Sequence, residues 1–141
     1  MNASMPYGVD TERSTNDPGG SRVVDPDATA DDRLYSTFMH VCVLGNHVGL
    51  PLVGFIVSLV LWLTKRDESP FIDDHGREVI NFQISLAIWY TLSALLVPMC
   101  GLGVLSAMVV YVLALVVSIV NAIRANQGEY VRYPITIRFL A

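Results

Sequence analysis

Hydrophobic and polar positions in this chain separate into long uncharged runs and short charged stretches. Residues 34–64 contain no Asp, Glu, Lys or Arg, a run of 31 residues. Two further uncharged runs follow at residues 79–99 and 102–123, separated by a turn that is rich in glycine and proline. A helix of about 20 apolar residues crosses the roughly 30 Å hydrocarbon core of a bilayer. The pattern therefore predicts an α-helical integral membrane protein.

The first run is interrupted near its middle. As one helix it would be about 46 Å long, which exceeds the hydrocarbon core. Gly45, Gly49 and Pro51 fall inside it, and proline removes a helical hydrogen bond. Two arrangements fit, namely a hairpin of helices 34–46 and 51–64, or one kinked and tilted helix. We favour the hairpin, and so an all-α polytopic fold of four helices: a short N-terminal hairpin plus two full transmembrane helices.

Polar residues recur along the start of the third predicted helix. Ser69 and Pro70 are good starting residues for a helix. The spacings that follow are four, three and four residues, which places the side chains on one helical face. That face carries Asp74, Glu78, Asn81 and Ser85.

Two more polar residues belong to the same set of candidate site residues. Gln83 lies off that face, and we expect Asn121, near the end of the last run, to be a partner for these polar residues on the same cytoplasmic side. Polar groups inside a span are costly unless they have partners. Interhelical hydrogen bonds are the simplest interpretation. A pore lining or a face that binds a partner is the functional alternative.

Charge is distributed unevenly along the chain. The sequence is 52% hydrophobic and only 16% charged, against about 25% charged in soluble domains. Residues 1–33 account for the whole net charge of −4, so the remainder is balanced and offers no basic surface for nucleic acid. We predict a disordered acidic tail at 1–30, a transmembrane helical domain at 31–127 and a short cytoplasmic or interfacial tail at 128–141.

Basic residues predict the orientation in the membrane. Lys65, Arg66 and Arg77 flank the loop between the second and third helices, and three more arginines follow the last helix. The turn between the last two helices has no basic residue. By the positive-inside rule, loop 65–78 and the C-terminus are cytoplasmic in a multi-pass protein of the cell membrane. The side of the N-terminus depends on whether residues 34–64 form a hairpin or one helix.

Potential metal ligands occur in the first uncharged run, at His40, Cys42 and His47. Their spacing matches no standard zinc site, so we expect neither a metal nor another cofactor.

An acid–base cluster lies at the entry to the third helix, formed by Asp73, Asp74, His75 and Glu78. Helix capping and pairing with nearby arginine explain that cluster without catalysis. With no recognisable catalytic motif, we expect no catalytic residues and no enzymatic activity.

Four stretches carry a resemblance to a known family. They are Lys65-Arg66-Asp67-Glu68-Ser69-Pro70-Phe71, Asp74-His75-Gly76-Arg77-Glu78, Asn81-Phe82-Gln83-Ile84-Ser85 and Asn126-Gln127-Gly128-Glu129-Tyr130-Val131-Arg132-Tyr133-Pro134. Through them residues 31–140 resemble the Tic-twenty-like family of small bacterial and archaeal membrane proteins. The chloroplast relatives are four-helix components of a protein import channel, so the resemblance implies four helices.

The expected function is that of a non-enzymatic membrane component. Its polar helix faces would bind other membrane proteins or copies of the chain, and the resemblance implies a link to protein translocation. The alternative is a small oligomeric channel or transporter for an ion or small solute. In that case Asp74, Glu78, Asn81 and Gln83 would line its cytoplasmic mouth.

Overall fold

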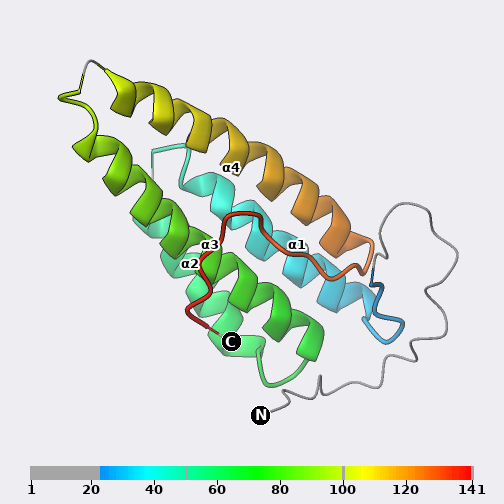
Figure 1. Ribbon diagram of the computed structural model, residues 1–141. Coiled ribbons are helices and arrows are strands. Elements are labelled where there is room, and N and C mark those ends of the chain that lie inside the picture. Colours follow the sequence, from blue (N-terminus) through cyan, green and yellow to red (C-terminus); the bar gives the residue numbers. More distant parts are fainter. Residues whose placement is uncertain (1–22, 50, 100, 141) are drawn as a thin grey trace, which may run out of the picture.

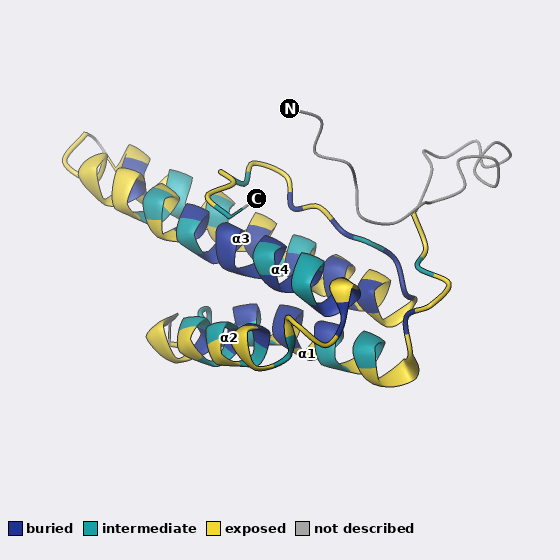
Figure 2. Ribbon diagram, turned by 90° about the horizontal axis from the view of Figure 1, so that it is seen from below, coloured by how far each residue is buried: buried dark blue, intermediate teal, exposed yellow. Residues whose placement is uncertain are grey.

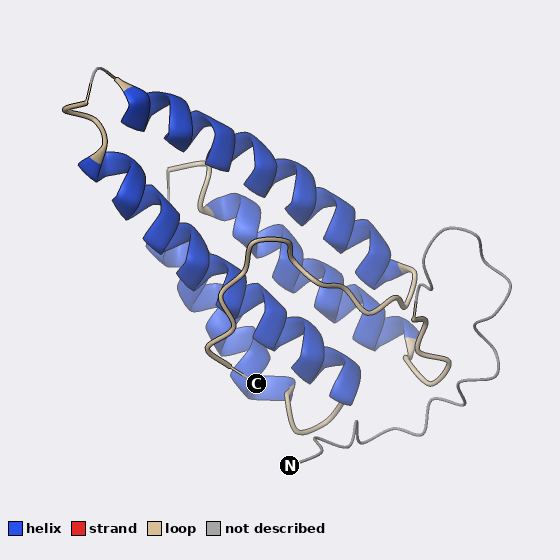
Figure 3. Ribbon diagram, viewed as in Figure 1, coloured by secondary structure: helices blue, strands red, loops and turns tan. Residues whose placement is uncertain are grey.

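Four α-helices form the described part of the protein (Figures 1 and 3). The computed structural model describes residues 23–49, 51–99 and 101–140. The helices are α1 (Ala30–Gly45), α2 (Pro51–Lys65), α3 (Pro70–Leu95) and α4 (Leu102–Asn126). The all-α fold is thus confirmed. The first uncharged run is two helices that part between Gly45 and Pro51, as the hairpin prediction required.

The helix starts follow local capping chemistry. The hydroxyl of Thr29 accepts the backbone N–H of Asp32 at 3.1 Å, while the Asp32 carboxylate accepts the N–H of Thr29 at 3.0 Å. This reciprocal capping box starts α1 at Ala30. The predicted first helix, 34–46, therefore began too late in the sequence, because Asp32 acts from inside the helix. α3 begins at Pro70 as predicted, although the Ser69 side chain makes no capping bond.

α4 alone among the described helices is long and apolar enough to cross a membrane. Its 25 residues rise about 37 Å. α2 is apolar but has only 15 residues. The second full transmembrane helix that we predicted is not confirmed, because Glu78, Asn81 and Gln83 interrupt the apolar part of α3.

The core lies where α1 meets the other helices, because α1 packs against α2, α3 and α4. Figure 2 shows buried residues on the helix sides that face one another and exposed residues on the outside. Met39, Val43 and Val79 are fully buried in this core. Most of the exposed residues on α4 are large and apolar, which suits an environment of lipid rather than water.

The C-terminal strap, residues 128–140, returns over α3 (Figure 1). Gly128, with φ of 78°, follows the end of α4, where a left-handed glycine commonly ends a helix. The strap reverses direction at Pro134–Ile135. Residues 23–25 lie beside its start, where the N–H of Tyr130 donates to the carbonyl of Val23 at 2.9 Å. Of the disordered tail predicted at residues 1–30, residues 1–22 fall outside the described residues, whereas residues 23–29 pair with the strap and cap α1.

Gly54 permits close packing of α1 against α2, and we expect Gly54→Ala to destabilise the hairpin by about 2 kcal/mol. An added Cβ would lie 2.6 Å from the carbonyl oxygen of Cys42, which is backbone and moves little. Gly45→Ala is the matched control, because its Cβ would meet nothing closer than 3.7 Å. The effect of each substitution is measured as the change in the free energy of unfolding in detergent micelles. Equal effects of the two substitutions would contradict the close approach.

Candidate functional site

The polar stripe of α3, which we define as Glu78, Asn81 and Ser85, lies buried beneath the strap. The Asn81 side-chain oxygen accepts the N–H groups of Phe139 at 3.0 Å and Leu140 at 2.9 Å. Its amide nitrogen donates to the carbonyl of Leu140 at 2.9 Å. The stripe therefore binds extended backbone much as a neighbouring β-strand would.

Ser85 continues the same arrangement one helical turn further along. Its hydroxyl accepts the N–H of Ile137 at 2.9 Å and donates to the carbonyl of Asn81 at 2.8 Å. Ile137 and Phe139 meanwhile expose much of their apolar side chains on the outside of the strap. Non-helical backbone at membrane depth is tolerated only where its polar groups have partners. The stripe supplies those partners, which gives its spacing a structural reason.

Arginines of the strap neutralise the acidic end of the stripe. Arg132 makes two hydrogen bonds to Asp74, at 2.6 and 3.0 Å. Glu78 accepts the N–H of Tyr133 at 3.2 Å, and its other oxygen lies 3.3 Å from Nε of Arg138. Arg77 pairs instead with Asp73 at 2.6 Å. Within the acid–base cluster, Asp73 therefore pairs inside α3, whereas Asp74 and Glu78 pair with arginines of the strap.

A buried hydrogen-bonded chain crosses the bundle beside this stripe. Nε2 of His40 on α1 lies 2.9 Å from Nδ1 of His75 on α3, and Nδ1 of His40 lies 2.7 Å from the Tyr133 hydroxyl. Both histidines are fully buried. Ser118 and Asn121 of α4 lie close to the same hydroxyl, although the Ser118 hydroxyl and the Asn121 amide nitrogen have no hydrogen-bond partner. These hydrogen bonds thus link α1 and α3 to the strap, and Asn121 lies near Tyr133 rather than beside the polar stripe.

Burial keeps His75 neutral. His75 lies in the charged entry of α3, ahead of its apolar part, and burial lowers its pKa to about 4. The Asp74 carboxylate opposes that shift, Arg132 adds to it, and a hydrogen bond to the Glu129 backbone also opposes it. A neutral imidazole has one donor and one acceptor nitrogen. One arrangement that satisfies the contacts has Tyr133 donating to His40 and His40 donating to His75.

The remaining predicted residues lie elsewhere. The side-chain oxygen of Gln83 accepts a hydrogen bond from Asn46 at 3.0 Å, so Gln83 ties α3 to the α1–α2 turn. Nδ1 of His47 lies 3.2 Å from the carbonyl of Val43, and its ring meets Tyr111 edge-on. Within the described ranges, no group of three or more His, Cys, Asp or Glu residues could hold a metal ion.

Sequence reasoning missed the pairing of His40 with His75 and Tyr133. These residues are separated by 35 and 93 positions along the chain, so no local pattern brings them together. The available signal was chemical: a histidine in an uncharged run requires a polar partner from another element. That argument identifies His40 as a residue in need of a partner without naming the partner.

Comparison with known proteins gives the family. The model of the magnetosome magnetite crystal formation protein family (MamF/MmsF) matches residues 31–140, which is well over half of the chain. No curated protein and no solved structure gives a match.

This match overturns the resemblance to the Tic-twenty-like family, and with it the basis for a link to protein translocation. Several residues that carried the resemblance, including Glu78, Asn81 and Arg132, hold the strap against the bundle. Their pattern therefore reflects how the bundle closes, and closure of this kind does not identify a biological process. The chain belongs to the magnetosome magnetite crystal formation protein family.

Proposed function

We propose that the chain is a non-enzymatic integral membrane protein that contributes to magnetite crystal formation at the magnetosome membrane. The family description, which names magnetosome magnetite crystal formation, supports the role in mineral formation. The surface of α4 is the observation that supports the location in a membrane. Exposed apolar side chains run along it from one end to the other, at Leu105, Val109, Val112, Val116, Ile119 and Ile123. Its polar residues Ser118 and Asn121 are buried, which is the arrangement expected for a helix that borders lipid.

The contacts of the polar residues support a structural role. Asn81 and Ser85 bind the strap backbone, and Glu78 binds both its backbone and its arginines. A pore or a partner that used these three residues would first have to displace the strap. We therefore propose that the chain associates with other membrane proteins, or with copies of itself, through its outward apolar faces.

Complementation tests the proposal. A magnetite-forming bacterium that lacks its own member of this family would express the chain with a tag. We expect the tagged chain to remain in magnetosome membranes after alkaline extraction, and crystal size in electron micrographs to recover toward that of the intact strain. Gly45→Ala should recover crystal size equally well, because that change leaves the packing undisturbed. A chain that is stably inserted but leaves crystal size unchanged would contradict the role in mineral formation.

A further inference from the structure

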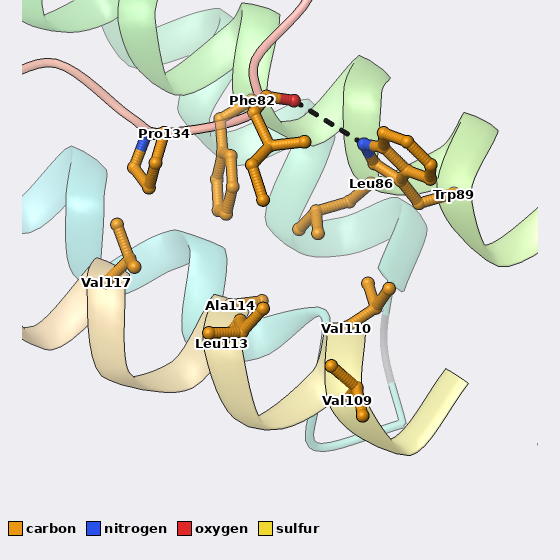
Figure 4. Close-up of a pocket in the computed structure, with 10 residues that line it drawn as sticks. Phe82, Leu86, Trp89, Val109, Val110, Leu113, Ala114, Val117 and Pro134 are labelled. Carbon is orange, nitrogen blue, oxygen red and sulfur yellow. Dashed lines mark hydrogen bonds between the residues drawn. The ribbon is translucent and has the colours of Figure 1, made fainter. Parts of the chain in front are cut away.

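An apolar groove of about 230 Å³ lies between α3 and α4. Ala114 on α4 forms its floor and is only 1% exposed. Figure 4 shows side chains of α3 on one side, side chains of α4 on the other, and the turn of the strap beside them. Its lining includes Phe82, Leu86, Leu113, Val117 and Pro134.

The groove offers almost no hydrogen-bonding group. Of the residues that line it, Trp89 alone has a polar side-chain atom, and its indole N–H donates to the carbonyl of Ile135 at 3.5 Å. A polar solute or a water molecule would find no partner there, and such groups are costly to bury without one. The lining therefore favours a hydrocarbon ligand over a polar one.

Depth and size narrow the choice of occupant. Ala114 is 12 residues from both Leu102 and Asn126, since 114 − 102 and 126 − 114 are both 12. That places it about 18 Å from either end of α4, at the centre of a hydrocarbon core about 30 Å thick. A second helix is roughly 10–12 Å across with its side chains, so it could place only a few side chains in a groove of about 230 Å³. A linear hydrocarbon chain lacks that bulk and can lie along the groove.

We propose that this groove binds one acyl chain of a membrane phospholipid and retains it as part of the folded protein. The inference rests on the membrane location proposed above. The bound chain would fill the space between α3 and α4 and support the strap at Pro134–Ile135. Because the groove contacts only the hydrocarbon of the lipid, it does not discriminate between headgroups.

Native mass spectrometry tests the proposal, using protein reconstituted with dioleoyl phosphatidylglycerol or dioleoyl phosphatidylcholine and then extracted into mild detergent. We expect one retained phospholipid per chain, to within about twofold for the two headgroups. Val109→Phe, at the edge of the groove, excludes about two methylene groups and should lower retention about tenfold. Val112→Phe is the matched control, because both valines are 51% exposed on the same helix and only Val109 lines the groove.

Each outcome decides the matter. Retention that survives Val112→Phe and falls with Val109→Phe supports the groove. A folded protein that retains no lipid, equal behaviour of the two variants, or a lipid-free dimer that Val109→Phe dissociates would overturn it. Alkaline extraction of membranes is a separate measurement. Release of the protein by alkali would contradict the proposed membrane location. Protein that stays in the membrane but retains no lipid would contradict only the proposal for the groove.

Discussion

Acidification from neutral pH to about pH 4 is expected to lower the free energy of unfolding by about 3 kcal/mol through His75 alone. Its pKa falls from 6.5 to about 4 in the folded protein because the ring is buried beside His40. Above pH 6.5 the ring is neutral in both states. As the pH falls, the unfolded chain takes up the proton first, so stability is lost between about pH 6.5 and pH 4.

His75→Gln isolates this contribution, because glutamine keeps hydrogen-bonding capacity and does not titrate. The free energy of unfolding should be measured in detergent micelles across that pH range for both proteins. The difference between their slopes reports His75, since the carboxylates remain in both. His47→Gln is the control, because His47 is only partly buried and lies outside the pair, so its substitution should change the slope less than His75→Gln does. An unchanged slope in His75→Gln would show that the histidine pair does not control the acid response.

Asn81→Leu is expected to destabilise the protein by about 3 kcal/mol, because it removes the partners of three backbone groups at once. Those groups are the N–H of Phe139, the N–H of Leu140 and the carbonyl of Leu140. Leucine has nearly the same shape, so the packing of α3 changes little. Detergent-induced unfolding followed by tryptophan fluorescence measures the loss.

Thr91→Val provides the control for Asn81→Leu. Thr91 is also on α3, and its hydroxyl donates to the carbonyl of Ala87 within the same helix. This substitution removes a hydrogen bond that does not involve the strap, so we expect a loss well below 1 kcal/mol. Similar losses in the two variants would mean that Asn81 contributes to α3 alone.

The helices could be predicted largely from sequence because their signals are local. The glycine and proline residues between Gly45 and Pro51 marked the hairpin, and Ser69–Pro70 marked the start of α3. The shared face of Glu78, Asn81 and Ser85 followed from the helical period. The start of α1 was misplaced because Thr29 and Asp32 cap each other reciprocally.

The partners of that polar face could not be predicted. Asn81 and Phe139 are separated by 58 positions, and the strap has no regular secondary structure whose period could indicate a docked face. The sequence shows that Asn81 requires a partner without distinguishing a neighbouring helix, a pore or a returning segment. The resemblance to the Tic-twenty-like family was wrong for a related reason. The residues that carried it close the bundle, and closure of this kind does not identify a biological process.

Hydrogen exchange of the strap in lipid nanodiscs tests the central claim, which is that the polar stripe of α3 holds the chain's own C-terminal segment. Mass spectrometry would follow the amides of Tyr133, Ile137, Phe139 and Leu140, whose N–H groups have side-chain acceptors on α3. We predict slow exchange in the intact protein and faster exchange of Phe139 and Leu140 in Asn81→Leu. Exchange in the intact protein as fast as in an unstructured peptide would contradict the account and leave the stripe open to a partner or a pore.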